Sequence, residues 1–120
     1  MPVGDKNNVR THVLNGENLK NVSKKILVSP NNGWDDHVMR LFEIGKDGYT
    51  PKHSHDWFHV NYIVSGKGIL HLNGTDYEVS EGSFAYVPAG EEHQFRNIGN
   101  ETFSFICIVP KEGDKDYLDC

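Results

Sequence analysis

Four histidines are the residues of this chain whose type and spacing best fit a chemical task. His53, His55 and His59 form an H-x-H-x-x-x-H cluster, and His93 follows further along the chain, after Pro88. Imidazole nitrogens are common ligands for Mn, Fe, Ni, Cu and Zn. Histidines clustered in this way indicate a metal site more specifically than separate surface roles. The sequence therefore predicts one divalent transition metal bound by all four side chains.

The neutrality of the four proposed ligands sets the chemistry of the predicted centre. Without a carboxylate ligand, a divalent ion keeps its full positive charge, which favours anionic or enolate-like chelating ligands and disfavours oxidation to the trivalent ion. A six-coordinate ion with four imidazoles has two positions left for water, substrate or dioxygen. The sequence does not name the metal, because four imidazoles suit several first-row ions.

Strands are expected to position these histidines. Residues i and i+2 of a strand project from the same face, so His53, His55 and His59 are predicted to share one face of a strand that Pro51 leads into. A helix would also bring His55 and His59 together, but Pro51 and the β-rich residues after Trp57 argue against it. No glutamate follows His55, as the metalloprotease motif would require. The strand interpretation is therefore favoured.

Short β-rich runs separated by turn signals recur along the whole chain. They predict nine strands, at residues 9–14, 25–29, 37–44, 58–65, 68–73, 76–79, 83–87, 93–97 and 102–109. Asn73-Gly74 lies between two of these runs and predicts a type I′ hairpin, because both central residues of that turn need positive φ. No helix of ordinary length is expected. Nine strands at this spacing indicate an all-β barrel or sandwich.

Length and composition limit the organisation of the protein and its partners. The 120 residues suffice for one compact core, so a single domain over 1–120 is predicted. A net charge of -5 offers no basic surface to nucleic acid. No apolar run fits a membrane helix or a signal peptide, so we expect a cytoplasmic protein without membrane contact. Cys107 and Cys120 are predicted to be free thiols.

Two segments resemble the two conserved motifs of the cupin superfamily. The first is Gly48-Tyr49-Thr50-Pro51-Lys52-His53-Ser54-His55-Asp56-Trp57-Phe58-His59, closing at Gly66. The second is Gly82, Pro88-Ala89-Gly90, His93 and Asn97. His59 stands where the first motif usually has a glutamate ligand, and Gly48 is one residue closer to the first histidine than is common. The chain is therefore most similar to small four-histidine monocupins, some of which hold manganese.

The resemblance implies a fold, a cofactor and a partner. The fold would be a double-stranded β-helix, a jelly-roll barrel of roughly six to eight strands, with a metal-binding core at about 37–109. One divalent metal per subunit is implied, manganese first and iron, nickel, copper or zinc as alternatives. The protein would be a homodimer in which the N-terminal strands, within residues 9–29, contact the neighbouring subunit. Trp57, Phe58 and Tyr62 are expected in core and dimer contacts.

The analogy with small cupins also places Arg40, Phe105 and Cys107 in the cavity, as candidate catalytic residues around the metal. Alternate residues of a strand share a face, so Phe103, Phe105 and Cys107 should point the same way. Arg40 is the only cation of an apolar strand and could bind a carboxylate or enolate through two hydrogen bonds; a surface position is the alternative. Cys107 is expected to pack in the core rather than to ligate the metal or act as a nucleophile.

Three functions follow from these features. The favoured one is a dioxygenase-type or related oxidoreductase acting on a small chelating substrate that is enolisable, a dicarbonyl or a carboxylate. The first alternative is a metal-dependent isomerase or lyase, which needs a general base that the ligand strands do not obviously supply. The second alternative is a non-catalytic cupin that binds a small molecule. The sequence does not name the substrate, since fold analogy carries no such information.

Overall fold

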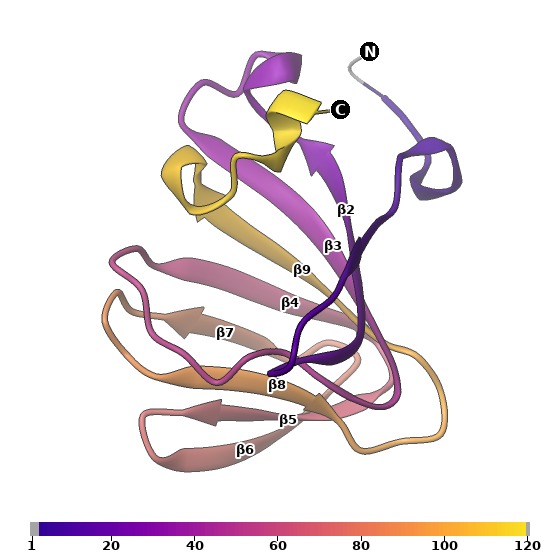
Figure 1. Ribbon diagram of the computed structural model, residues 1–120, viewed down its shortest axis with the longest axis vertical. Helices are drawn as coiled ribbons and strands as arrows, with labels where there is room; N and C mark the ends of the chain where they lie inside the picture. Colours follow the sequence, from indigo (N-terminus) through magenta and orange to yellow (C-terminus); the bar gives the residue numbers. More distant parts are fainter. Residues whose placement is uncertain (1–2, 120) are drawn as a thin grey trace.

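The computed structural model describes residues 3–119 and is built from nine strands (Figure 1). The strands are β1 (His12–Leu14), β2 (Lys20–Val28), β3 (His37–Tyr49), β4 (His59–Ser65), β5 (Lys67–Leu72), β6 (Thr75–Ser80), β7 (Phe84–Val87), β8 (His93–Asn97) and β9 (Phe103–Pro110). Four short 3-10 turns complete the described chain: η1 (Lys6–Asn8), η2 (Pro30–Asn32), η3 (Lys111–Gly113) and η4 (Asp116–Asp119). All nine predicted strands are present, although β2 begins earlier and β3 ends later than the sequence suggested.

The strands pair antiparallel in one sheet that curls into a nearly closed barrel (Figure 1). The order across the sheet is β6-β5-β8-β3-β9-β4-β7, and β2 pairs with β3 beside this path. β1 pairs with β2 of the same chain. The all-β barrel is therefore confirmed, whereas the contact of the N-terminal strands with a neighbouring subunit stays a prediction.

Two glycine positions show how the sequence shapes the barrel. Asn73 and Gly74 have φ values of 48° and 85° between β5 and β6, so the predicted type I′ hairpin has the positive φ values that it needs. Gly68 lies against the ring of Phe103, which occupies the space that a Cβ atom would take. A side chain at Gly68 would therefore push β5 away from the core.

β9 runs through the core and confirms the predicted alternation of its side chains. Phe103, Phe105 and Cys107 point inward and are almost completely buried. Phe105 stacks between Phe42 and Phe95, with ring centroids 5.3 and 4.2 Å away. This aromatic stack forms a rigid wall inside the barrel.

Two further sequence predictions concern the cysteines and the membrane. Cys107 is a free, buried thiol, as expected. Cys120 lies outside the described residues. Between residues 3 and 119, no helix has the length and apolar character needed to cross a membrane.

The segment between β3 and β4 differs from the sequence prediction. Residues 50–58 form a loop in which only His53 makes a β-bridge, to His93, and the chain bends at residues 56–57. The backbone N–H of His53 donates to the carbonyl of His93 at 3.1 Å, and the reverse bond measures 2.9 Å. The prediction of one strand through three histidines was therefore wrong. Pro51 has no N–H for a strand ladder, and the bend separates His55 from β4.

Candidate metal centre

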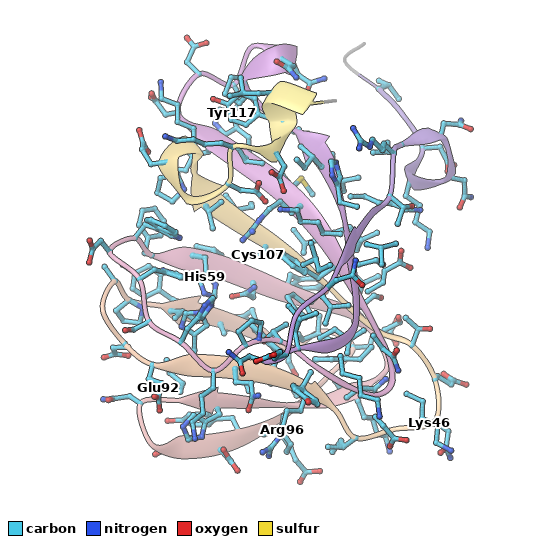
Figure 2. The ribbon with its side chains drawn as sticks, in the orientation of Figure 1. Lys46, His59, Glu92, Arg96, Cys107 and Tyr117 are labelled. Carbon is cyan, nitrogen blue, oxygen red and sulfur yellow. The ribbon has the colours of Figure 1, made fainter. Side chains whose placement is uncertain are left out.

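The four predicted histidines come together from three different segments, with His59 and His93 buried, His55 half-buried and His53 exposed. His53 and His55 lie on the loop before β4, His59 is the first residue of β4, and His93 is the first residue of β8. His53, His55 and His93 bring one ring nitrogen each to within 4.8 Å of one another. The Nε2 atom of His59 lies 3.2 Å from Nε2 of His93. In Figure 2, His59 points into the interior of the barrel.

Backbone carbonyls orient two of these imidazoles. Nδ1 of His55 donates to the carbonyl of Trp57 at 2.9 Å, and Nδ1 of His93 donates to the carbonyl of Glu91 at 2.9 Å. Because a carbonyl oxygen can only accept, each Nδ1 must carry the proton in these contacts. Each Nε2 therefore presents a lone pair, which is the state that a metal ligand needs.

A side-chain amide orients the third imidazole. Nδ1 of His59 lies 2.6 Å from Oδ1 of Asn61, whose Nδ2 donates to the carbonyl of Ile106 at 3.4 Å. The amide oxygen thus faces His59, and Nδ1 of His59 donates to it. Nε2 of His59 and Nε2 of His93 then face each other as two acceptors at 3.2 Å, an arrangement that a cation between them would stabilise. The donor set therefore fits a divalent transition metal.

The pKa values of all four imidazoles are lowered in the folded chain. Burial lowers the pKa of His59 to about 4 and the pKa of His93 to about 4. The pKa values of His53 and His55 also lie below the ordinary value of 6.5, first because of burial and then because of the neighbouring histidines. Metal binding at neutral pH thus needs no loss of a proton from these side chains.

The stability of the metal-free protein should depend on pH in the direction that these pKa values set. His59 and His93 bind protons near pH 6.5 in the unfolded chain and only near pH 4 in the folded chain. Their contribution to stability is complete above pH 6.5 and is lost as the pH falls toward 4. Urea unfolding of the chelator-treated protein at pH 7.5 and at pH 5 should show a lower midpoint at pH 5. Equal midpoints, or the same decrease in a His59→Asn variant, would contradict this assignment.

A cavity of about 230 Å³ adjoins the imidazoles. Its wall includes the apolar side chains of Leu14, Leu19, Val22, Phe42, Phe95 and Phe105. Trp57 packs against the core, as expected, and also lines the cavity, where it stacks on His55 with ring centroids 4.7 Å apart. The volume lies below the ~300–1,000 Å³ typical of drug-sized sites, so the space fits a small molecule.

Arg40, Phe105 and Cys107 all line this cavity, so Arg40 is not a surface residue. Nη2 of Arg40 donates to Sγ of Cys107 at 2.8 Å, and Nη1 donates to Oδ2 of Asp114 at 3.2 Å. The guanidinium also stacks on Phe42, with Cζ 4.7 Å from the ring centroid. Nε is buried and has no hydrogen-bond partner among residues 3–119. Both Nη groups thus donate to residues of the chain itself. The sequence suggested instead that Arg40 donates two hydrogen bonds to a substrate carboxylate or enolate.

Two charged residues near the cavity were missed by sequence reasoning. Nζ of Lys24, which lines the cavity, lies 2.7 Å from Oδ2 of Asp114, on the segment that follows β9. Burial alone would raise the pKa of Asp114, but the hydrogen bond from Lys24 and the charge of Arg40 hold it below its ordinary value. Lys24 and Asp114 lie far apart in the sequence, each among other polar residues, so no local pattern indicates that they pair.

Asn61 was also missed, and here a signal existed. It follows His59 by two residues in β4 and therefore shares its inward face. Replacing Asn61 with alanine should weaken metal binding by ~10–100-fold, because Nδ1 of His59 loses the acceptor that fixes its tautomer. Asn61→Asp should restore or increase the affinity, since a carboxylate is a stronger acceptor. Chelator competition with Mn²⁺ and Zn²⁺ measures the effect, with the exposed Asn100→Ala variant as the control. Unchanged affinity in Asn61→Ala would show that this contact does not orient the ligand.

Fold and site together define a class: a β-barrel protein with clustered histidines on its inner wall beside a small apolar cavity. The family described as "Cupin domain" matches residues 40–109, and the chain belongs to this family. The jelly-roll fold expected from the sequence is therefore confirmed. The histidine cluster supports metal binding, with three of the four residues mutually close, whereas manganese and the fourth ligand stay predictions.

Similar proteins include several with named activities. The oxalate-binding protein of Thermotoga maritima is 33% identical over 58 residues, 48% of either chain. The 1-methylthio-D-xylulose 5-phosphate methylsulfurylase of Rhodospirillum rubrum is 28% identical over 100 residues, 83% of this chain and 63% of that protein. These matches span less than two thirds of the relatives' lengths. The solved polyketide cyclase RemF from Streptomyces resistomycificus superposes with a TM-score of 0.84 and 28% identity, covering 92% of this chain and 79% of that one.

Proposed function

We propose that this cupin is a metal-dependent enzyme that binds a small chelating substrate and acts on its enolate or carboxylate form. The observation that carries the proposal is the convergence of oriented, neutral imidazoles on a cavity whose wall also contains the Arg40 guanidinium. A divalent metal, when bound, supplies a Lewis acid that stabilises negative charge on substrate oxygens. His53, His55, His59 and His93 would hold it, with manganese first and Fe, Ni, Cu or Zn as alternatives.

Arg40 would bind the anionic oxygen of the substrate through its Nε–H. This donor is buried without a partner in the described chain, a state that costs about 1–3 kcal/mol and that a substrate oxygen would relieve. Contacts with Asp114, Cys107 and Phe42 hold the guanidinium in place, so that its free donor has a fixed direction. Arg40 thereby selects substrates with a negative charge.

Phe105 and Cys107 would act on the substrate indirectly. Phe105 supports the flat aromatic wall of the cavity by stacking between Phe42 and Phe95. Burial raises the pKa of Cys107, which keeps it a thiol and makes it a poor nucleophile. Cys107 would therefore position Arg40, whereas Phe105 would favour a planar substrate.

The comparisons support an enzyme that handles oxygen-rich compounds. Two of the similar proteins are named as enzymes, a cyclase and a methylsulfurylase, and the third is named for binding oxalate, a chelating dicarboxylate. Among the described residues, no Asp or Glu lines the cavity, which disfavours an isomerase that depends on a carboxylate base. Dioxygenase-type chemistry therefore stays our first proposal. Because one similar protein is named as a cyclase, enolate chemistry without dioxygen is our second proposal.

The test begins with metal content and continues with turnover. Protein purified without a histidine tag should contain close to one first-row metal per subunit by elemental mass spectrometry. It should convert members of a panel of 1,3-dicarbonyl compounds and 2-oxo acids, with oxygen consumed in step with product. Arg40→Gln should raise KM for the anionic substrates, and the exposed Arg96→Gln should not. Turnover without oxygen uptake would favour the second proposal. Metal binding without any turnover would indicate a binding protein. Failure to bind metal would overturn the proposal.

A further inference from the structure

The residues that follow β9 form part of the cavity wall. Residues 111–119, called the C-terminal segment below, contain the two short turns η3 and η4. In Figure 1 this segment, in yellow, lies beside η2, where Nδ2 of Asn31 donates to the carbonyl of Tyr117 at 2.7 Å. Gly113 of η3 lines the cavity. A displacement of the C-terminal segment would therefore open the cavity on this side.

Gly113 lets the segment approach the cavity closely. A Cβ atom at this position would lie 2.7 Å from Nε1 of Trp57 and 2.9 Å from Cδ1, so a side chain would force the two apart. Trp57 also lines the cavity, and its ring stacks on His55. The C-terminal segment thus closes onto an aromatic ring that contacts a candidate metal ligand.

The C-terminal segment has little apolar anchoring. Within residues 111–118, Asp114 is the one buried residue, with a side chain only 3% exposed. Tyr117 is partly buried against the core, and Leu118 is 68% exposed. Carboxylates are almost never buried unless they are paired. Segments with few buried apolar contacts open most easily. The attachment of this segment to the barrel therefore depends on the ionic contacts of Asp114.

Both cations that bind Asp114 belong to the cavity wall. Oδ2 of Asp114 accepts from Nζ of Lys24 at 2.7 Å and from Nη1 of Arg40 at 3.2 Å. Lys24 and Arg40 also line the cavity. The two cations therefore hold the C-terminal segment and are available to an anion inside the cavity.

The charges of this group leave room for one more anion. Two largely buried cations share one buried carboxylate, which leaves one positive charge in excess. Asp116 also contacts Lys24 at 2.7 Å, but its side chain is 47% exposed, so water and salt screen its charge. Nε of Arg40 is buried and has no partner among residues 3–119. A carboxylate suits this position, because its two oxygens can accept from a guanidinium and an ammonium together.

We propose that Lys24 and Arg40 form a carboxylate subsite of the cavity, and that a carboxylate bound there weakens the attachment of the C-terminal segment. Two carboxylates that share the same cations repel each other, so each reduces the binding of the other. This coupling is reciprocal: a ligand that releases the segment binds more tightly where the segment is already released. The segment thus acts as a gate that opens for carboxylates. In taking this carboxylate to be that of the substrate, the proposal rests on the proposed function.

Hydrogen exchange followed by mass spectrometry tests the gate in chelator-treated protein. Butyrate is the probe, since it joins a carboxylate to a short apolar chain that suits the cavity wall. Butyramide, which has nearly the same shape without the charge, is the control. With butyrate, peptides that cover the C-terminal segment should exchange ~10-fold faster, whereas β8 and β9 should not. The affected N–H groups include those of Lys111, Asp116 and Leu118, which donate to Asp36, Asp114 and Lys115.

Calorimetric titration with butyrate tests the subsite in matched variants. Lys24→Met removes one cation and should weaken butyrate binding by ~10-fold or more, as expected for a lost hydrogen bond to a charged group. Asp114→Asn removes the competing charge and should strengthen binding by ~10-fold, with fast exchange of the segment even without butyrate. Glu112→Gln is the control, because it removes the same charge from an exposed position of the same segment. It should change neither quantity.

The outcomes separate the subsite, the gate and the proposed function. Butyrate that binds no better than butyramide would overturn the subsite. Butyrate that binds while exchange of the segment stays equal or slows would overturn the gate. The exchange experiment on the wild type needs no variant, so it decides the question even if Asp114→Asn does not fold. Both measurements use metal-free protein, so a lack of turnover with the substrate panel would overturn only the proposed function.

Discussion

Replacing His93 with alanine is expected to remove the metal almost completely. His93 lies close to all three other histidines, with its Nε2 atom 3.2 Å from Nε2 of His59 and ring contacts to His53 and His55. The loss should exceed the ~10–100-fold expected when only a supporting hydrogen bond is removed. Elemental mass spectrometry and calorimetric titration with Mn²⁺ would measure it.

The matched control for this variant is His71→Ala. His71 also lies on a strand, but it contacts Asp76 and Glu92 on the polar side of the barrel. This variant should bind metal like the wild type. If His93→Ala retained stoichiometric metal, the centre would lie elsewhere; if His71→Ala lost it, the loss would reflect damage to the barrel rather than to a ligand set.

Replacing the buried Asp114 with alanine is expected to cause a large loss of stability. The variant removes the carboxylate that Lys24 and Arg40 share. The side chains of these two cations are only 9 and 11% exposed. Removing one partner of a buried ion pair usually lowers the stability by about 3–5 kcal/mol. We expect about 3 kcal/mol, because Lys24 keeps a second acceptor in Asp116 at 2.7 Å. Urea unfolding of the metal-free protein measures the difference.

The control and the pH dependence sharpen this prediction. Asp35→Ala removes an exposed carboxylate and should change the free energy of unfolding very little. Because the pKa of Asp114 is held below its ordinary value of 3.8, its contribution is present above that value and is lost as the pH falls through the lowered pKa. A loss at pH 7 no larger than that of Asp35→Ala would contradict the buried pairing.

Most of the fold could be predicted because it is encoded locally. Alternating side chains and turn residues such as Asn73-Gly74 mark all nine strands. The parity of β9 put Phe105 and Cys107 on one face, and the resemblance to small cupins indicated that this face points inward, as it does. The course of the loop between β3 and β4 was harder to predict. The bend after His55 depends on how the loop meets β8, and only the bridge from His53 to His93 reveals it.

The candidate site was predictable in its ligands and less so in its surroundings. Histidines have a recognisable spacing, and Asn61 could have been found by the same i, i+2 argument that linked the histidines. Lys24 and Asp114 carried no such signal, since long-range pairs of charged residues look like solvated surface in a sequence. The structure alone shows that they meet beside the cavity.

The contact of Asn61 with two partners has a consequence for the end of the chain. Asn61 accepts from His59 and donates to the carbonyl of Ile106, the neighbour of Cys107, which receives the Nη2 donor of Arg40, whose Nη1 reaches Asp114. A relay of polar contacts thus runs from a candidate ligand to the segment that follows the last strand. Replacing Asp114 is therefore expected to change the setting of His59 as well as the stability of the barrel.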